Sequence, residues 1–155
     1  MLRSGLTVAL VTLVLDQWSK WAALATLDPA QPISVTPFFN LVLVWNRGVS
    51  FGMFHSSGAF APWLLSGLAL AVVVGLVIWL KRTDQLLTGL GLGLVIGGAA
   101  GNVIDRIRFG AVIDFLDFHL AGYHWPAFNV ADAAICVGAA LMLADGLLAR
   151  RSQPT

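Results

Sequence analysis

The chain has 155 residues, of which 58% are hydrophobic and only 11% are charged, and its formal net charge is +1. A soluble domain usually carries about 25% charged residues, so this composition excludes an ordinary soluble domain and predicts a polytopic membrane protein. The sequence has no basic face for a nucleic acid, and we expect no nucleic-acid partner.

Four apolar segments are long enough to cross a bilayer, which takes about 20 residues in a helix. They cover approximately residues 6–27, 61–80, 86–106 and 127–149. We therefore expect one domain, 1–155, of the all-α membrane class: four transmembrane helices with a small extracytoplasmic β-hairpin or sheet formed by residues 28–60. The first apolar run has no small-residue cleavage pattern behind it, so it is expected to remain as an uncleaved span.

Basic residues flank these spans on one side. If four spans alternate, Arg3, Lys81 with Arg82, and Arg150 with Arg151 all fall on the same side of the membrane. The positive-inside rule then predicts that both termini are cytoplasmic and that segments 28–60 and 107–126 are on the outer side.

The first span contains two charged residues, Asp16 and Lys20, one helical turn apart. Each alone would cost about 2.5–3.5 kcal/mol near the centre of a membrane helix. As a pair in acid-first order they can neutralise each other, and the lysine can also snorkel toward the outer surface. The pair is expected to support the helix packing more than to take part in chemistry.

Segment 28–60 begins with three prolines that exclude a helix. The run FFNLVLVWN that follows is β-prone, Asn46-Arg47-Gly48 is a turn signal, and VSFGMF is a candidate return strand. Turn geometry alone can explain Asn46 and Gly48, and a substrate-binding role is the alternative. The aromatic residues of this segment are suited to the membrane interface.

The third span carries a ladder of small residues, since Gly89, Gly93, Gly97 and Gly101 recur every four residues. Such a ladder lets another helix approach closely. The 3.6-residue period brings Asn102, Asp105 and Arg106 to one face at the outer end of the same helix.

The fourth span opens with Asn129, a good N-cap, and Asp132, three residues on, occupies the capping-box position. Before it, segment 107–126 holds Asp114, Asp117, His119 and His124. We expect Asp117 and the two histidines to be solvated or interfacial, because their spacing matches no metal-ligand pattern. No metal or other cofactor is therefore expected.

Two other kinds of nucleophile are weak candidates. Cys136 lies among apolar residues inside the fourth span and is expected to be core. Ser19 and Lys20 are adjacent, and adjacent residues of a helix point in different directions, which disfavours a Ser–Lys dyad.

A pair of aspartates is the better hypothesis. Two carboxyls close together cannot both ionise, so one keeps a proton with a raised pKa. The ionised partner can activate water, and the protonated partner can protonate a leaving amine. The residues alone do not choose Asp114 over Asp105 or Asp117 as the partner of Asp132.

The chain resembles lipoprotein signal peptidase (signal peptidase II), a bacterial family of membrane aspartic peptidases. The matching blocks are DQWSK at 16–20, NRGVSFG at 46–52, GGAAGNVIDRIRFGAVIDF at 97–115 and FNVAD at 128–132. They occur in the family's order over nearly the whole chain. Ser50 departs from the alanine that is more common in the family.

The resemblance implies that Asp114 and Asp132 are the catalytic pair. It also implies that Asn46, Gly48, Asn102, Arg106 and Asn129 line the site or bind substrate, and that Asp16, Lys20, Gly101 and Asp105 support it. The implied activity is removal of the signal peptide from prolipoproteins, just before a lipobox cysteine that carries diacylglyceryl. Globomycin-type inhibitors, membrane lipids, the bacterial inner membrane and a monomeric state are the further expectations.

Two rival hypotheses come from other classes. In a small proton-coupled transporter or channel subunit, Asp16, Asp105, Asp114 and Asp132 would form a relay through the membrane. In an assembly or scaffold protein, the same acids would serve only as caps and ion pairs.

Overall fold

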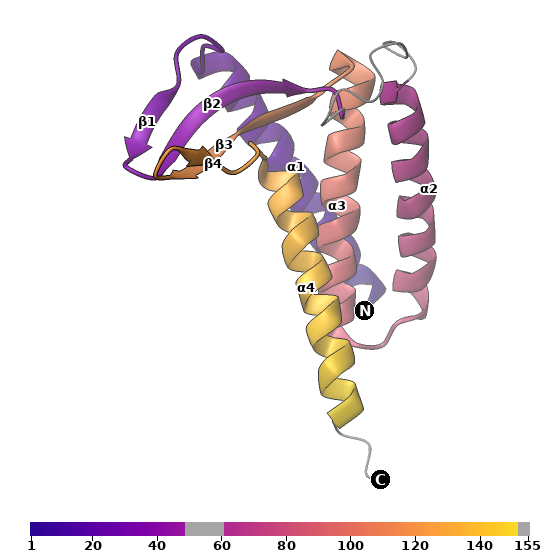
Figure 1. Cartoon of the computed structure of the whole chain (residues 1–155). Coiled ribbons are helices and arrows are strands. Elements are labelled where there is room, and N and C mark those ends of the chain that lie inside the picture. Colours follow the sequence, from indigo (N-terminus) through magenta and orange to yellow (C-terminus); the bar gives the residue numbers. More distant parts are fainter. Residues whose placement is uncertain (49–60, 152–155) are drawn as a thin grey trace.

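A computed structural model describes residues 1–48 and 61–151 of the chain, which form four helices and four strands. In chain order they are α1 (Leu2–Thr26), β1 (Ile33–Thr36), β2 (Phe39–Asn46), α2 (Ala61–Arg82), α3 (Leu86–Phe109), β3 (Val112–Leu120), β4 (Tyr123–His124) and α4 (Val130–Arg151). The helices form a bundle, and the strands form a sheet that projects from one end of it, called the sheet end below (Figure 1). Helix α1 begins and helix α4 ends at the opposite end.

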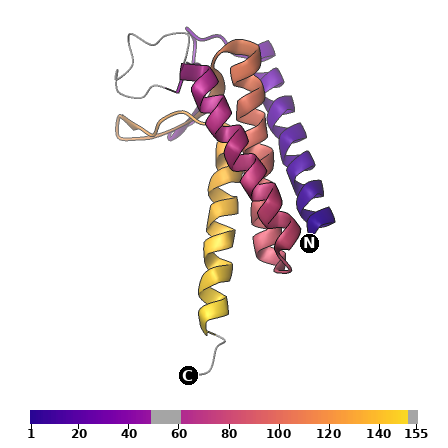
Figure 2. The ribbon, with the colours of Figure 1, turned by 90° about the vertical axis from the view of Figure 1, so that its right-hand side faces the viewer.

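Helix α3 is the centre of the bundle, and it packs against α1, α2 and α4 (Figure 2). Its glycines make this possible. A Cβ added at Gly97 would lie 2.8 Å from Cβ of Thr12 on α1, and one added at Gly98 would lie 3.0 Å from Ile135 on α4. The predicted close approach of another helix is confirmed, and α3 in fact uses two small-residue faces, one for each neighbour.

Three helical stretches in the described part of the chain are long and apolar enough to cross a membrane: Trp63–Arg82, Leu86–Phe109 and Val130–Leu148. Helix α1 is not among them, although it has 25 residues, because its half nearer the sheet is polar. Many apolar side chains face outward, as lipid-facing ones do in a helical membrane protein; Leu68 and Leu143, for example, are 63% and 70% exposed.

The sheet is antiparallel, with the order β1-β2-β3-β4. Strand β2 falls on the predicted β-prone run, but its neighbours are β1 and β3, and the sheet is therefore larger than a hairpin within 28–60. The candidate return strand VSFGMF lies outside the described residues. Strand β3 was not predicted, because Asp114, Asp117 and His119 obscure the alternation of its apolar residues.

Helix α3 ends at Phe109, three residues beyond the predicted span 86–106. Gly110 follows the last helical residue with φ +69°, and its N–H bonds to the carbonyl of Arg106 at 3.0 Å. Glycine adopts this left-handed conformation without the steric cost that other residues meet. The chain then turns directly into β3, so the polar end of α3 and the start of β3 are adjacent.

Candidate active site

The sheet end of α3 presents the polar face that the helical period predicted. Asn102 and Asp105 are 7% and 1% exposed, and Arg106 is half-buried beside them. Buried polar groups are stable only when their hydrogen-bonding groups are paired, so the contacts of these residues define the site.

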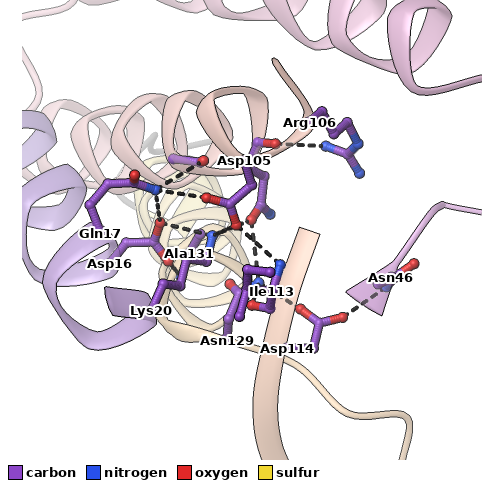
Figure 3. A network of polar contacts seen from close by, with 12 residues as sticks. Asp16, Gln17, Lys20, Asn46, Asp105, Arg106, Ile113, Asp114, Asn129 and Ala131 are labelled. Atoms are coloured by element: carbon purple, nitrogen blue, oxygen red, sulfur yellow. Dashed lines mark hydrogen bonds and ion pairs between the residues drawn. The ribbon is translucent and has the colours of Figure 1, made fainter. Parts of the chain in front are cut away.

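Lys20 lies between two carboxylates. Its Nζ is 2.9 Å from Oδ2 of Asp16 and 2.8 Å from Oδ2 of Asp105, and it donates to Oδ1 of Asn102 at 2.9 Å (Figure 3). The predicted pairing with Asp16 is confirmed. The expectation that Lys20 snorkels to the surface is wrong, since it is 2% exposed, because Asp105 and Asn102 hold the ammonium toward α3.

The remaining oxygens of this ion cluster are also paired. Gln17 Nε2 donates to Oδ1 of Asp105 at 3.0 Å, and the backbone N–H of Ile113 donates to Oδ2 at 3.1 Å. The N–H of Ala131 donates to Oδ1 of Asp16 at 2.9 Å. The cluster thus ties α1, α3, β3 and α4 together. Gln17 was not predicted as a site residue, although an amide in the apolar first span was a usable signal.

Asn102 connects the ion cluster to Asp132. Its Oδ1 accepts from Lys20 and, at 3.3 Å, from Asn129 Nδ2, so its own Nδ2 is directed to Oδ1 of Asp132 at 2.8 Å. The two donors on Oδ1 fix the orientation of the amide. Lys20 therefore influences Asp132 through one intervening side chain.

Asn129 and Asp132 form the predicted capping box at the start of α4. The N–H of Asp132 donates to Oδ1 of Asn129 at 3.0 Å, and the N–H of Asn129 donates to Oδ2 of Asp132 at 3.3 Å. Asp132 lies in the first turn, where the helix dipole favours a negative charge. The cap and a chemical role for Asp132 are compatible.

Asp114 is 1% exposed and lies on β3, facing the same asparagine. Asn129 Nδ2 donates to its Oδ1 at 2.7 Å, and Asn46 Nδ2 donates to its Oδ2 at 2.8 Å. Burial, and to a smaller extent the negative charge of Asp132, raises the pKa of Asp114 to about 6, although the bonds from Asn46 and Asn129 act to lower it.

Asn46 has the turn role that the sequence indicated, and it also contacts Asp114. The N–H of Gly48, at φ +77°, donates to Oδ1 of Asn46 at 2.9 Å, which is a turn contact. Because Oδ1 is engaged, the amide group of Asn46 is directed to Asp114 (Figure 3). The turn therefore positions a donor for the carboxyl.

Arg106 is only loosely held. Its Nη1 is 3.4 Å from the carbonyl of Asn102, and its buried Nε has no hydrogen-bond partner within the described part of the chain. Its charge interacts with those of Asp132, Asp105 and Asp114. A guanidinium with a free donor beside two aspartates is suited to binding a carbonyl or carboxylate group.

Two side chains outside this network differ from the expectations. Asp117 was expected to be solvated, but it is 6% exposed, because Asn40 donates to it at 2.9 Å and His124 contacts it at 2.9 Å. Partial burial acts to raise the pKa of Asp117, but these bonds and the nearby imidazoles hold it below its usual value. Cys136 was expected in the core and is exposed on α4.

No group of three or more histidine, cysteine or acidic side chains in residues 1–48 and 61–151 could hold a metal ion. The polar residues of the site instead form one connected network of carboxylates, amides and two cations at the sheet end of a bundle of apolar helices. This arrangement is typical of a membrane protein that performs chemistry or transport at one surface.

Comparisons with known proteins identify the class as a bacterial membrane enzyme. One solved structure, described as a bacterial membrane enzyme at 2.3 Å resolution, superposes with a TM-score of 0.79 at 26% identity, over 97% of this chain and 91% of that one. A second, at 1.9 Å resolution, gives 0.77 at 26% identity, over 90% and 89%.

The sequence comparisons identify the family. The profile described as signal peptidase (SPase) II matches residues 8–148. The lipoprotein signal peptidase of Methylorubrum extorquens (strain PA1) is 48% identical over 94% of this chain and 86% of its own length. That of Ralstonia nicotianae is 48% identical over 92% and 83%. The chain belongs to the signal peptidase II family.

Proposed function

We propose that this protein is an aspartic endopeptidase that removes signal peptides from diacylglyceryl-modified prolipoproteins, cleaving just before the lipidated cysteine. Its relatives are named lipoprotein signal peptidases, which supports the substrate class. The observation that carries the aspartic mechanism is that one asparagine, Asn129, bonds both Asp114 and Asp132. The reaction needs no cofactor.

The two aspartates have different surroundings, which supports different roles. Asp132 accepts N–H bonds from the side chain of Asn102 and from the backbone of Asn129, in the first turn of α4. Asp114 is almost fully buried, and its pKa, raised to about 6, lets it hold a proton at a higher pH than an ordinary aspartate does. Asp132 is thus the base that activates water, and Asp114 the acid.

In the reaction, Asp132 takes a proton from water as the water oxygen attacks the scissile carbonyl carbon. Asp114 first donates a hydrogen bond to the developing oxyanion and then transfers its proton to the leaving amine, so the pair ends with the proton on the opposite carboxyl. Arg106 and Asn102 contact the substrate backbone, and the Nε of Arg106, which has no partner among the described residues, supplies a donor for a peptide carbonyl.

The proposed topology is four membrane spans within one domain, with α1 as a span in addition to the three apolar stretches of α2, α3 and α4. Pairing of Lys20 with Asp16 and Asp105 lowers the cost of placing the charges of α1 in the membrane. The basic residues Arg3, Lys81 and Arg82 lie at or near the helix ends opposite the sheet, which supports cytoplasmic termini and an active site near the outer face of the bacterial inner membrane. We propose a monomer.

The relay hypothesis is less well supported. Four of the chain's eight acidic residues, Asp16, Asp105, Asp114 and Asp132, belong to one network at the sheet end. A transmembrane relay would place them at successive depths. Asp145 is not part of this network: it lies in the half of α4 away from the sheet, where it accepts a bond from Thr88 at 2.5 Å.

The substrate proposal is tested with the purified chain and two synthetic lipobox peptides that differ only in the diacylglyceryl group on cysteine. We expect cleavage before the cysteine of the lipidated peptide, sensitivity to globomycin, and little turnover of the unlipidated peptide. Equal turnover of the two peptides contradicts the substrate class. Proton flux into liposomes without cleavage would support the transporter hypothesis instead.

A further inference from the structure

Asp117 and His124 form a second polar cluster, outside the network just described. Both oxygens of Asp117 lie 2.9 Å from Nδ1 of His124 on β4, and Asn40 Nδ2 on β2 donates to Oδ2 at 2.9 Å. The rings of His124 and His119 stack with their centroids 4.9 Å apart. A carboxylate that is 6% exposed is costly to bury, and the mechanism above gives it no task.

The cluster lies at the first end of segment 123–128, which leads into the active site. Strand β4 has only two residues, and the chain enters it through Ala121 and Gly122, which have φ +50° and +85°. Beyond β4 the segment runs back along β3. The N–H of Trp125 donates to the carbonyl of Phe118 at 2.8 Å, and Pro126, which has no N–H, leaves a gap in the ladder.

The other end of this segment leads to Asn129, which bonds both members of the proposed catalytic pair. Phe128 exchanges backbone bonds with Leu116, at 2.9 and 3.1 Å. The next residue is Asn129, which bonds Asp114 and caps the turn that holds Asp132. Asp114 itself is three residues before Asp117 on β3. The segment 123–128 therefore sets the position of one catalytic carboxyl relative to the other.

We propose that Asp117 and His124 act as a clasp that positions the catalytic pair: the clasp holds segment 123–128 on β3, so that Asn129 stays within bonding distance of both aspartates. Neither clasp residue touches the reacting atoms, and both are positioning residues. The inference rests on the proposed peptidase function. Small displacements of reacting groups, of about 1 Å, can cost on the order of a hundredfold in rate, so loosening the clasp lowers kcat.

A matched pair of variants tests the clasp. In His124→Asn the side-chain amide can occupy the position of Nδ1 and still donate to Asp117, whereas in His124→Gln it reaches the position of Nε2 instead. Both variants are neutral and polar, so they differ mainly in this contact. Tyr123→Phe is the control, because Tyr123 is 84% exposed in the same two-residue strand.

The measurements are kcat and KM on the lipidated peptide, with the thermal unfolding midpoint of each full-length variant. We expect His124→Gln to lower kcat by about tenfold or more, with KM nearly unchanged, and His124→Asn to keep most of the activity. The double variant Asp117→Asn/His124→Gln should be no slower than the slower single variant, because both remove one contact.

Equal kcat values for the Asn and Gln variants overturn the clasp, as does a loss of kcat that appears only where the folded fraction falls. Additive losses in the double variant also overturn it. If His124→Gln does not fold, Asn40→Ala loosens Asp117 from the β2 side, and an unchanged kcat there contradicts the proposal. A wild-type chain that does not cleave the lipidated peptide would refute the peptidase function itself, which distinguishes the two failures.

Discussion

Replacing Lys20 with methionine is expected to destabilise the protein strongly. The substitution keeps the length and apolar stem of the side chain but removes the ammonium. Asp16 and Asp105, which are 0% and 1% exposed, then face each other without the cation that lies 2.9 and 2.8 Å from their oxygens. Removing one partner of a buried ion pair costs about 3–5 kcal/mol, because it leaves a buried charge uncompensated.

The same substitution reaches the active site. Asn102 loses the nearer of the two donors to its Oδ1 and keeps only the 3.3 Å bond from Asn129, so its amide is less firmly held with Nδ2 toward Asp132. We therefore expect kcat to fall together with stability. The assay is thermal and denaturant unfolding in detergent micelles followed by tryptophan fluorescence, for which the chain has 6 tryptophans, with peptide hydrolysis measured well below the unfolding midpoint.

A compensating substitution tests the cause. In the double variant Lys20→Met/Asp16→Asn the cluster has one carboxylate fewer, and the remaining Asp105 keeps the bonds from Gln17 and Ile113. Part of the lost stability should return. If Lys20→Met costs less than about 1 kcal/mol, the value of a surface pair, or if Asp16→Asn adds to its cost, the electrostatic reasoning is refuted.

Three further predictions follow from the same geometry. Asn46→Ala removes a donor that favours ionised Asp114, so the pKa of Asp114 should rise above about 6 and the alkaline limb of the kcat/KM profile should move to higher pH; an unmoved limb would show that Asp114 does not supply the proton. Asp114→Asn should abolish cleavage yet stabilise the fold at pH 7. Because the pKa of Asp114 rises from 3.8 in the unfolded chain to about 6 in the folded one, ionisation of this carboxyl costs the folded state about 3 kcal/mol. Asparagine removes that cost but also loses one hydrogen bond, which takes back about 1 kcal/mol of the gain. This gain should disappear below about pH 4, where the carboxyl is protonated in both states, and unfolding curves at the two pH values measure it. Gly97→Ala should lower the unfolding midpoint, because the added Cβ would press on Thr12. In the control Gly75→Ala the added Cβ meets no described atom within 4 Å, so the midpoint should stay unchanged or rise. Equal shifts in the two variants would contradict the close packing of α1 on α3.

The helical part of the fold was predictable because its signals are local. The ladder from Gly89 to Gly101 and the capping pair of Asn129 and Asp132 are periodic or short-range patterns, and the structure matches both. The glycine that ends α3, Gly110, is a local signal of the same kind. The apolar amino-acid composition of the chain makes such patterns easier to recognise, because any polar residue stands out against its apolar neighbours.

The sheet and the outer cluster were harder to predict because they depend on contacts far apart in the sequence. Asn40 and Asp117 are 77 residues apart, and only their pairing across β2 and β3 explains why a carboxylate is buried there. Gln17 was missed for a similar reason, since its partner Asp105 is 88 residues away. The choice of Asp114 as the partner of Asp132 came from family resemblance, and it stays a proposal that the contacts of Asn129 with both carboxyls support.

The most direct test of the aspartate pair is single-turnover cleavage of the lipidated peptide by Asp114→Asn and by Asp132→Asn, with peptide binding measured on the same preparations. Asparagine nearly preserves the shape of each side chain but cannot exchange the proton. We predict that each variant folds and binds the peptide with nearly wild-type affinity while its cleavage rate falls by about a thousandfold or more, a loss of at least about 4 kcal/mol of transition-state stabilisation. A folded variant of either residue that cleaves within about tenfold of the wild-type rate would contradict the central claim.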